Sequence, residues 1–172
     1  MHVEILNAEQ AATSVPRLAE ILIDAVASGA GVSFLHPLSQ DDAEQFWRDQ
    51  LPGVVAGKTF ILICKDSLRQ IMGVVMLHKA WAPNQPHRGD VAKLLVHRDF
   101  RRLGVGSALM LEMEKLAQKI GLRMINFDAV AGGAPDRLYR TLGYHVVGTI
   151  PGYAFSGQDN KLDDVVFFYK TF

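Results

Sequence analysis

One stretch of the sequence, residues 90–121, constrains the fold of this chain more than any other. Within it an apolar run over 90–96 leads through a basic link to Gly104 and Gly106, and a run with a helical apolar stripe follows to residue 120. This order predicts a strand, a link and an amphipathic helix that begins at the glycines. Glycines at a helix start let backbone N–H groups approach an anion closely, and the helix dipole favours negative charge there. The stretch therefore predicts a seat for a phosphate group.

The residues around the two glycines exclude one common phosphate-binding motif and disfavour another. A Walker A loop requires Gly-Lys-Ser/Thr after its glycines, but Ser107 and Ala108 follow Gly106. A dinucleotide fingerprint requires a third glycine and a start directly after the strand. Leu109 stands at that third position, and the basic link intervenes. A surface helix that begins with glycines and binds nothing is the alternative without a ligand.

The pattern Arg101-x-x-Gly104-x-Gly106 resembles the pyrophosphate loop, Arg/Gln-x-x-Gly-x-Gly/Ala, of the GCN5-related N-acetyltransferase (GNAT) family, whose members bind acetyl-coenzyme A. The resemblance covers most of the chain and is closest to the subgroup that contains the tabtoxin-resistance acetyltransferase. The other segments that carry it are 29–34, 92–96, 127–128, 142–144, 151–153 and 168–172. It implies an α/β fold with a mixed sheet of about seven strands, about four flanking helices, and parallel central strands that splay apart to admit the pantetheine arm.

Length and composition predict a single domain over residues 1–172. The chain is 49% hydrophobic, enough for one substantial core, and no Pro/Gly/Ser-rich linker divides it. Its 18 basic and 18 acidic side chains cancel, which disfavours nucleic acid as a partner. No apolar run approaches the roughly 18 residues of a membrane span. With one cysteine, Cys64, and no basic-then-apolar leader, we expect a cytoplasmic protein without disulfides.

Hydrophobic periodicity and turn residues predict the remaining elements. We expect strands over 3–6, 59–65, 71–78, 90–96, 123–130, 145–150 and 164–171, and helices over 14–29, 39–52, 103–120 and 134–143. The strand, helix and strand between 90 and 130 imply a right-handed parallel crossover. The last two strands are expected to pair antiparallel and to be joined by a Gly/Pro-rich loop through Tyr153.

The segment 29–38 is neither periodic nor very polar, and it places Val32, Phe34 and Leu35 between glycines and Pro37. A loop of this composition can fold over a pocket. The alternative is a loop that Phe34 merely anchors in the core.

Acetyl transfer to an amine requires a held thioester, a polarised carbonyl, a deprotonated amine and a protonated leaving thiolate. The resemblance implies that the central strand offers backbone groups to pantetheine and to the acetyl carbonyl, and that the loop amides meet the pyrophosphate. Arg101 and Arg102 would add positive charge there, unless they form only a solvated basic link. The implied coenzyme-binding residues are Leu94, Leu95, Val96, Arg101, Arg102, Leu103, Gly104, Val105, Gly106 and Ser107.

Three residues are candidates for proton transfer. An amine with a pKa near 10 is mostly protonated at neutral pH, so a carboxylate near the slot can bind the ammonium group and take its proton, often through water. Asp90 and Asp128 lie on adjacent predicted strands; a buried polar bridge or a strand-end turn are the structural alternatives. The resemblance gives Tyr139 the role of general acid toward the thiolate, with aromatic core packing as the alternative. Gly132 replaces an asparagine that many family members carry, so no role is transferred to it.

The candidate residues leave three functional hypotheses. The six histidines form no metal-binding spacing, and Gly-x-Ser-x-Gly is absent, so we expect neither a metal nor a hydrolase elbow. An acetyl-CoA-dependent N-acetyltransferase of small-molecule amines accounts for all the candidate residues, and the resemblance suggests β-lactam amino-acid toxins or antibiotic-like compounds as acceptors. A protein or peptide N-acetyltransferase and a non-catalytic acyl-CoA sensor are the alternatives. We expect a monomer or a homodimer.

Overall fold

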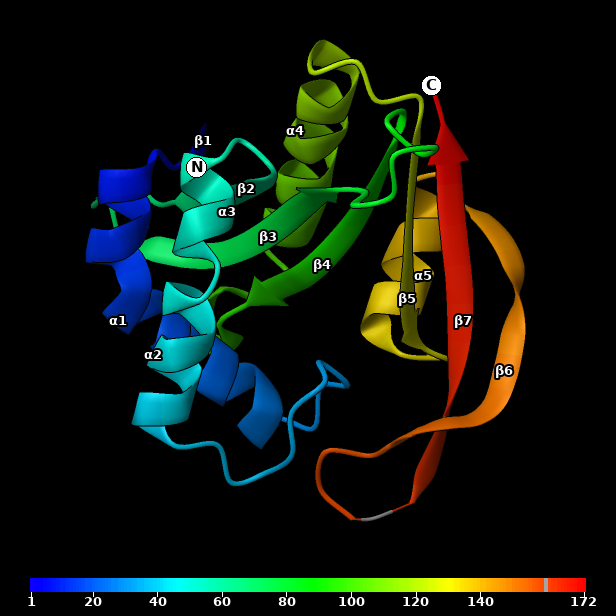
Figure 1. Ribbon diagram of the computed structural model, residues 1–172. Helices are drawn as coiled ribbons and strands as arrows, with labels where there is room; N and C mark the ends of the chain where they lie inside the picture. The colour runs from blue at the N-terminus through cyan, green and yellow to red at the C-terminus, as the bar shows by residue number, and fades with distance from the viewer. Residues whose placement is uncertain (160) are drawn as a thin grey trace.

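The computed structural model describes residues 1–159 and 161–172 and consists of a seven-stranded mixed sheet with helices on both faces (Figure 1). Four helices contain eight or more residues, which matches the predicted fold class. The elements in chain order are β1 (His2–Ile5), α1 (Ala8–Ala27), α2 (Gln40–Arg48), α3 (Leu51–Val55), β2 (Thr59–Lys65), β3 (Ile71–Lys79), β4 (Arg88–Val96), a 3₁₀ turn (Arg98–Phe100), α4 (Val105–Lys119), β5 (Met124–Val130), α5 (Ala134–Thr141), β6 (His145–Phe155) and β7 (Leu162–Thr171).

The parallel strands β4 and β5 separate in the middle of the sheet, whose order is β1-β2-β3-β4-β5-β7-β6. They pair only from Arg88↔Met124 to Asp90↔Asn126, although both strands continue well beyond this point. A β-bulge lies opposite β3 just after the paired section, and its residue Lys93 has a φ of 52°. The bulge bends β4 away from β5. The prediction of splayed parallel strands is therefore confirmed.

Two apolar layers hold the helices against the sheet. On one face α1 and α2 pack over β2, β3 and β4, with Trp47 and Leu18 fully buried. On the other face α4 and α5 pack over the sheet around Leu109, Phe127 and Phe168. The α1 and α2 layer does not extend over β5, β7 and β6, as Figure 1 shows, so that part of the sheet faces a loop instead of a helix.

The start of α1 differs from the prediction, which placed it at Ser14. The helix begins at Ala8, because Asn7 accepts a hydrogen bond from the N–H of Gln10 while the Gln10 side chain accepts one from the N–H of Asn7. This reciprocal capping box satisfies two N–H groups at the helix start. Pro16 lies inside the helix and not at its beginning.

The end of the chain also corrects the prediction. Tyr153 is not in a loop, because β6 continues through Pro151 and Gly152 to Phe155. A register shift between Ile150 and Ala154 accommodates this passage. A proline is tolerated here because β6 is an edge strand, where one face of the backbone has no strand to pair with. The short helix α3 was not predicted.

Candidate active site

The start of α4 presents a row of free backbone N–H groups. Gly104, the residue before the helix, has a φ of 82°, and no side chain caps the helix. Among the residues that the structure describes, the N–H groups from Arg102 to Ser107 donate to no protein acceptor. α4 is 15 residues long, so its dipole adds positive potential at this end. The arrangement fits a diphosphate, as the Gly-x-Gly motif predicted.

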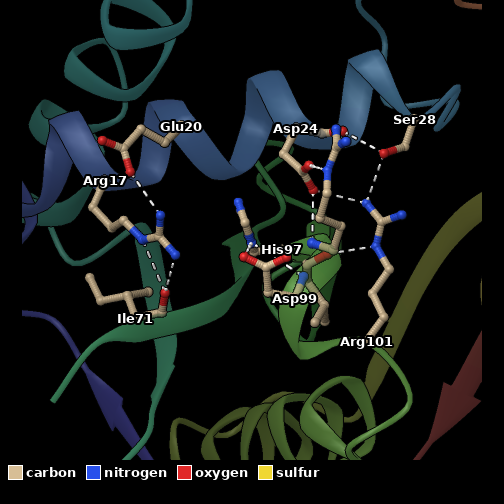
Figure 2. Close-up of polar contacts among 10 residues, drawn as sticks. Arg17, Glu20, Asp24, Ser28, Ile71, His97, Asp99 and Arg101 are labelled. Atoms are coloured by element: carbon tan, nitrogen blue, oxygen red, sulfur yellow. Dashed lines mark hydrogen bonds and ion pairs between the residues drawn. The ribbon is translucent and has the colours of Figure 1, made fainter. Parts of the chain in front are cut away.

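Arg101 does not point at this row of N–H groups. Its guanidinium donates to the Val96 carbonyl from Nε at 3.0 Å, and to Asp24 Oδ2 and Ser28 Oγ from Nη2 at 3.0 and 3.2 Å. Figure 2 shows these bonds reaching from the loop to helix α1. The motif arginine therefore ties the loop to α1. Arg102 has a φ of 63° and no side-chain partner among the described residues, so it is the basic side chain at this loop available to a phosphate.

Asp24 is the buried centre of this contact. Arg98 pairs with its carboxylate through Nε, and the N–H of Arg98 donates to Asp24 Oδ2 at 2.9 Å. Burial alone raises the pKa of Asp24, but the hydrogen bonds from Arg98 and nearby positive charges outweigh it and hold the pKa below its usual value. The carboxylate is therefore ionised at neutral pH and connects the 3₁₀ turn to α1.

The predicted backbone contacts of the central strand lie at the gap. Leu95 and Val96 still pair with β3, and Leu94 lies in the bulge. On the opposite side, β4 has no β5 partner after Asp90. The open edge of β4 can therefore offer backbone groups to a ligand in the gap, while the Val96 carbonyl already accepts a bond from Arg101.

Asp128 lies on β5 where that strand has separated from β4. It lines a cavity of about 260 Å³ together with the loop between α1 and α2 and the β6–β7 hairpin. Burial raises the pKa of Asp128, and the positive charge of Lys93 offsets part of that shift. A carboxylate that is accessible from the cavity and has a raised pKa is suited to accept a proton from an amine.

Lys93 was not among the predicted site residues. Its Nζ donates to the Val32 carbonyl at 2.9 Å and lies over the rings of Phe34 and Phe46, at 5.4 and 5.2 Å from their centroids. Burial lowers the pKa of Lys93, and the negative charge of Asp128 offsets part of that shift. The sequence held a usable signal, since a lysine inside an apolar strand is as costly to bury as Asp128.

Asp90 and Asp128 are not equivalent in the structure. Asp90 lies at the last paired position of β4 and β5, where it forms an ion pair with Arg88 and accepts a hydrogen bond from Asn126 Nδ2 at 3.0 Å. Arg88 Nη1 also donates to Asn126 Oδ1 at 2.7 Å. Asp90 thus belongs to a polar bridge across the paired end of β4 and β5 and not to a strand-end turn, which was its structural alternative.

Tyr139 lies on α5 within a cluster of aromatic rings. Its ring packs edge-on against Phe127 at 4.4 Å between centroids, and against Phe168 and Tyr144 at 5.5 and 5.9 Å. Burial and, next, the charge of Asp128 raise the pKa of Tyr139 well above its usual value. The phenol is therefore protonated at neutral pH, and the effect of Asp128 connects the hydroxyl electrostatically with the gap.

The loop over residues 29–38 closes one side of the cavity. The N–H of His36 donates to the Gly157 carbonyl at 2.8 Å, and Gln158 Nε2 donates to the Ala27 carbonyl at 2.8 Å, so the loop is bonded to the β6–β7 hairpin. Phe34 lines the cavity and also packs edge-on against Phe46 at 5.3 Å. The expectation that this loop folds over a pocket is confirmed, and Phe34 also anchors it.

Two further findings concern metal binding and membrane insertion. In the described residues, His, Cys, Asp and Glu side chains form no group of three or more that could hold a metal ion. None of the described helices combines the length and the apolar character needed to cross a membrane.

Comparison with known proteins agrees with the geometry. The model of the acetyltransferase (GNAT) family matches residues 23–144, which is more than half of the chain. The chain belongs to the GNAT family. The matched region contains the row of N–H groups, the splayed strands, Asp128 and Tyr139. This GNAT protein is therefore an acetyltransferase, and acetyl-CoA is the donor that the family uses.

Solved structures share the fold over nearly the whole chain at low sequence identity. Ribosomal-protein-alanine N-acetyltransferase from Brucella melitensis is 16% identical with a TM-score of 0.80, and covers 100% of both chains. A GCN5-related N-acetyltransferase from Kribbella flavida is 19% identical with a TM-score of 0.80, covering 99% of this chain and 98% of its own. The structure of YncA from Salmonella typhimurium contains its cofactor acetyl-CoA. YncA is 16% identical with a TM-score of 0.77, and the match covers 98% of this chain and 93% of YncA.

Proposed function

We propose that this GNAT protein acetylates an amine of a small molecule, with acetyl-CoA as the donor. The observation that carries the proposal is the cavity at Asp128. It lies where β5 has separated from β4, and one side of it is formed by the loop that His36 bonds to the β6–β7 hairpin. A cavity of about 260 Å³ suits a small acceptor better than an extended peptide.

The roles of the residues follow from their places around the gap. The free N–H groups from Arg102 to Ser107 bind the diphosphate of the coenzyme, with the Arg102 guanidinium beside them. Asp128 removes a proton from the acceptor ammonium, directly or through water, so that the nitrogen lone pair can attack the thioester carbonyl. As the carbon–sulfur bond breaks, the Tyr139 hydroxyl donates its proton to the leaving thiolate. The proton that the nitrogen loses on becoming an amide returns the Tyr139 phenolate to the phenol, directly or through water, and the proton on Asp128 passes to solvent. Asp90 has no part in this scheme.

The two alternatives are weaker. A protein or peptide acceptor requires an open groove, whereas the loop and the hairpin are bonded to each other. A non-catalytic acyl-CoA sensor requires no carboxylate of raised pKa beside the gap. Detoxification of a β-lactam amino-acid toxin or a related antibiotic, the role that the subgroup resemblance suggests, is one case of small-molecule acetylation.

Thiol release from acetyl-CoA tests the proposal directly. Purified protein is incubated with acetyl-CoA and a panel of amines that includes β-lactam amino acids, aminoglycosides, simple alkyl and aryl amines, and peptides with free N-termini. We expect release with at least one small amine and much less with peptides. A preference for peptides would contradict the proposal, as would tight acetyl-CoA binding without release for any amine.

A further inference from the structure

We infer that the acceptor is a cationic amine with an apolar body and without a carboxylate next to the amine. The inference rests on the proposed function, because it concerns the cavity assigned to the acceptor. Within that function it disfavours the amino-acid toxins that the subgroup resemblance suggests. It follows from the charges in the cavity wall, the engagement of the nearest cation, and the aromatic side chains opposite Asp128.

The charges in the cavity wall have one sign. Asp128 on β5 and Asp163 on β7 both line the cavity, and its lining contains no lysine, arginine or histidine. Asp163 has no side-chain hydrogen bond or ion pair with any of the described residues. Two carboxylates attract an ammonium group and repel a carboxylate.

The nearest cation is not available to a ligand carboxylate. Lys93 Nζ is bonded to the Val32 carbonyl and lies over the rings of Phe34 and Phe46, while Phe34 itself forms part of the cavity wall. The Lys93 ammonium is therefore engaged by a carbonyl and two aromatic rings, and Lys93 is not part of the cavity lining. An amino-acid acceptor would bring its carboxylate into a cavity that offers it no cationic partner, and an unpaired charge is costly to bury.

The rest of the wall is apolar and accessible. Tyr153 and Phe155 of β6 line the cavity but are 52% and 63% exposed, and Leu35 of the loop is 58% exposed. Tyr153 is held edge-on against Phe167 at 5.4 Å between ring centroids. Exposed aromatic side chains beside a carboxylate suit the apolar body of an amine, and their faces attract cations.

Matched pairs of acceptors test this inference, because each pair differs only by one carboxylate. We would compare phenethylamine with phenylalanine, and cadaverine with lysine, by kcat/KM for thiol release from acetyl-CoA. The expected result is a preference of at least about tenfold for the carboxylate-free member of each pair, since one unfavourable charge contact of about 1.4 kcal/mol corresponds to tenfold. Equal or better turnover of the amino acids would overturn the inference and leave the proposed transferase intact.

Binding gives a second readout that does not depend on turnover. Saturation-transfer NMR would compare phenethylamine with phenylalanine on the same protein sample containing acetyl-CoA. Stronger transfer to phenethylamine supports the inference even if neither compound is acetylated, a result that would count against the transferase proposal alone. Equal transfer to both compounds would overturn the inference.

A variant of Asp163 tests whether the charge of the cavity wall causes the preference for amines without a carboxylate. Asp163→Asn removes one negative charge and should reduce the preference for phenethylamine over phenylalanine at least about threefold. The matched control is Asp164→Asn, at the neighbouring residue, which is not part of the cavity lining. Asp164 Oδ1 accepts a bond from the N–H of Gly152 at 2.9 Å, and an asparagine oxygen can still accept it. An identical preference in wild type and Asp163→Asn would overturn the assignment of the wall charge.

Discussion

Arg101 Nη2 lies 3.0 Å from Asp24 Oδ2, so the arginine of the pyrophosphate-loop motif is bonded to helix α1. The two residues are 77 positions apart in the chain. The contact fixes the loop in front of α4 against the layer of helices that also carries the cavity loop. The motif arginine thus positions the loop, and the backbone N–H groups are left to bind the phosphates.

Removing the charge of Asp24 should destabilise the fold. Asp24→Asn weakens charge-assisted bonds to Arg98 and Arg101, and we expect unfolding free energy to fall by about 1–3 kcal/mol at neutral pH. The folded-state pKa of Asp24 is lowered, so its contribution is present above the unfolded pKa of about 3.9 and is lost as the pH falls through the folded pKa. Chemical denaturation should therefore show that the difference in unfolding free energy between wild type and Asp24→Asn becomes smaller in acid. Glu20→Gln, in an exposed pair with Arg17, is the control and should change stability by less than about 0.5 kcal/mol.

Asp128→Asn should lower turnover by about 10²- to 10⁴-fold and leave acetyl-CoA affinity close to wild type, because the carboxylate acts on the amine. Burial raises the pKa of Asp128, so its charge costs stability above the unfolded pKa, and the asparagine variant should be at least as stable as wild type at neutral pH. On one protein sample, thermal melts check the stability and steady-state kinetics check the turnover. A lower melting temperature with turnover retained would make Asp128 a structural bridge.

Lys93→Met should move the acid limb of the kcat/KM profile to higher pH. Burial raises the pKa of Asp128, whereas the charge of Lys93 on β4 and a hydrogen bond from the Asp128 backbone lower it. Removing the Lys93 charge should therefore raise the pKa of Asp128 further. Methionine keeps an unbranched apolar stem and removes the charge.

Lys79→Met is the matched control for that change. Lys79 Nζ lies over the Phe60 ring at 5.7 Å and is not among the charges that act on Asp128. We expect its pH profile to match wild type. A Lys93→Met profile that also matched wild type would show that Lys93 only anchors the Val32 carbonyl.

Tyr139→Phe should reduce turnover by about 10²-fold, the low end for general acid catalysis, because a thiolate is a tolerable leaving group. The phenylalanine ring keeps the contacts with Phe127 and Phe168, so folding and acetyl-CoA binding should persist. The raised pKa of Tyr139 keeps the phenol protonated at neutral pH, so wild type should show no loss of activity from its ionisation there. Turnover within about twofold of wild type would leave the hydroxyl without a catalytic role.

Local patterns in the sequence predicted most of the elements, because hydrophobic periodicity and the glycines that end helices depend on residues that are close together in the chain. Ser39 illustrates this, since it stands at the predicted start of this helix and its hydroxyl caps α2, accepting a bond from the N–H of Asp42 at 3.1 Å. The predicted start of α1 at Ser14 was wrong, although Asn7 and Gln10, the residues of the capping box that begins the helix, are also neighbours in the sequence.

The site was only partly predictable, because its decisive contacts join distant residues. Nothing near Arg101 in the sequence indicates that Asp24 binds it, and nothing near Lys93 indicates the Val32 carbonyl. Asp90 and Asp128 both read as carboxylates on adjacent strands. Only the point at which β4 and β5 separate places Asp90 in the paired section and Asp128 beside the gap.

The most direct test of the phosphate site at the start of α4 is calorimetric titration with acetyl-CoA in the absence of an acceptor. The titration compares wild type, Gly104→Val and Gly121→Val. These glycines flank the two ends of α4 with φ of 82° and 83°, and no atom lies within 4 Å of an added Cβ at either, so valine strains both alike. Gly106 is less suitable, since its Cβ would meet Leu138 at 3.2 Å. We predict one binding site in wild type and in Gly121→Val, and loss of binding in a folded Gly104→Val. Equal affinity in all three proteins would contradict the account.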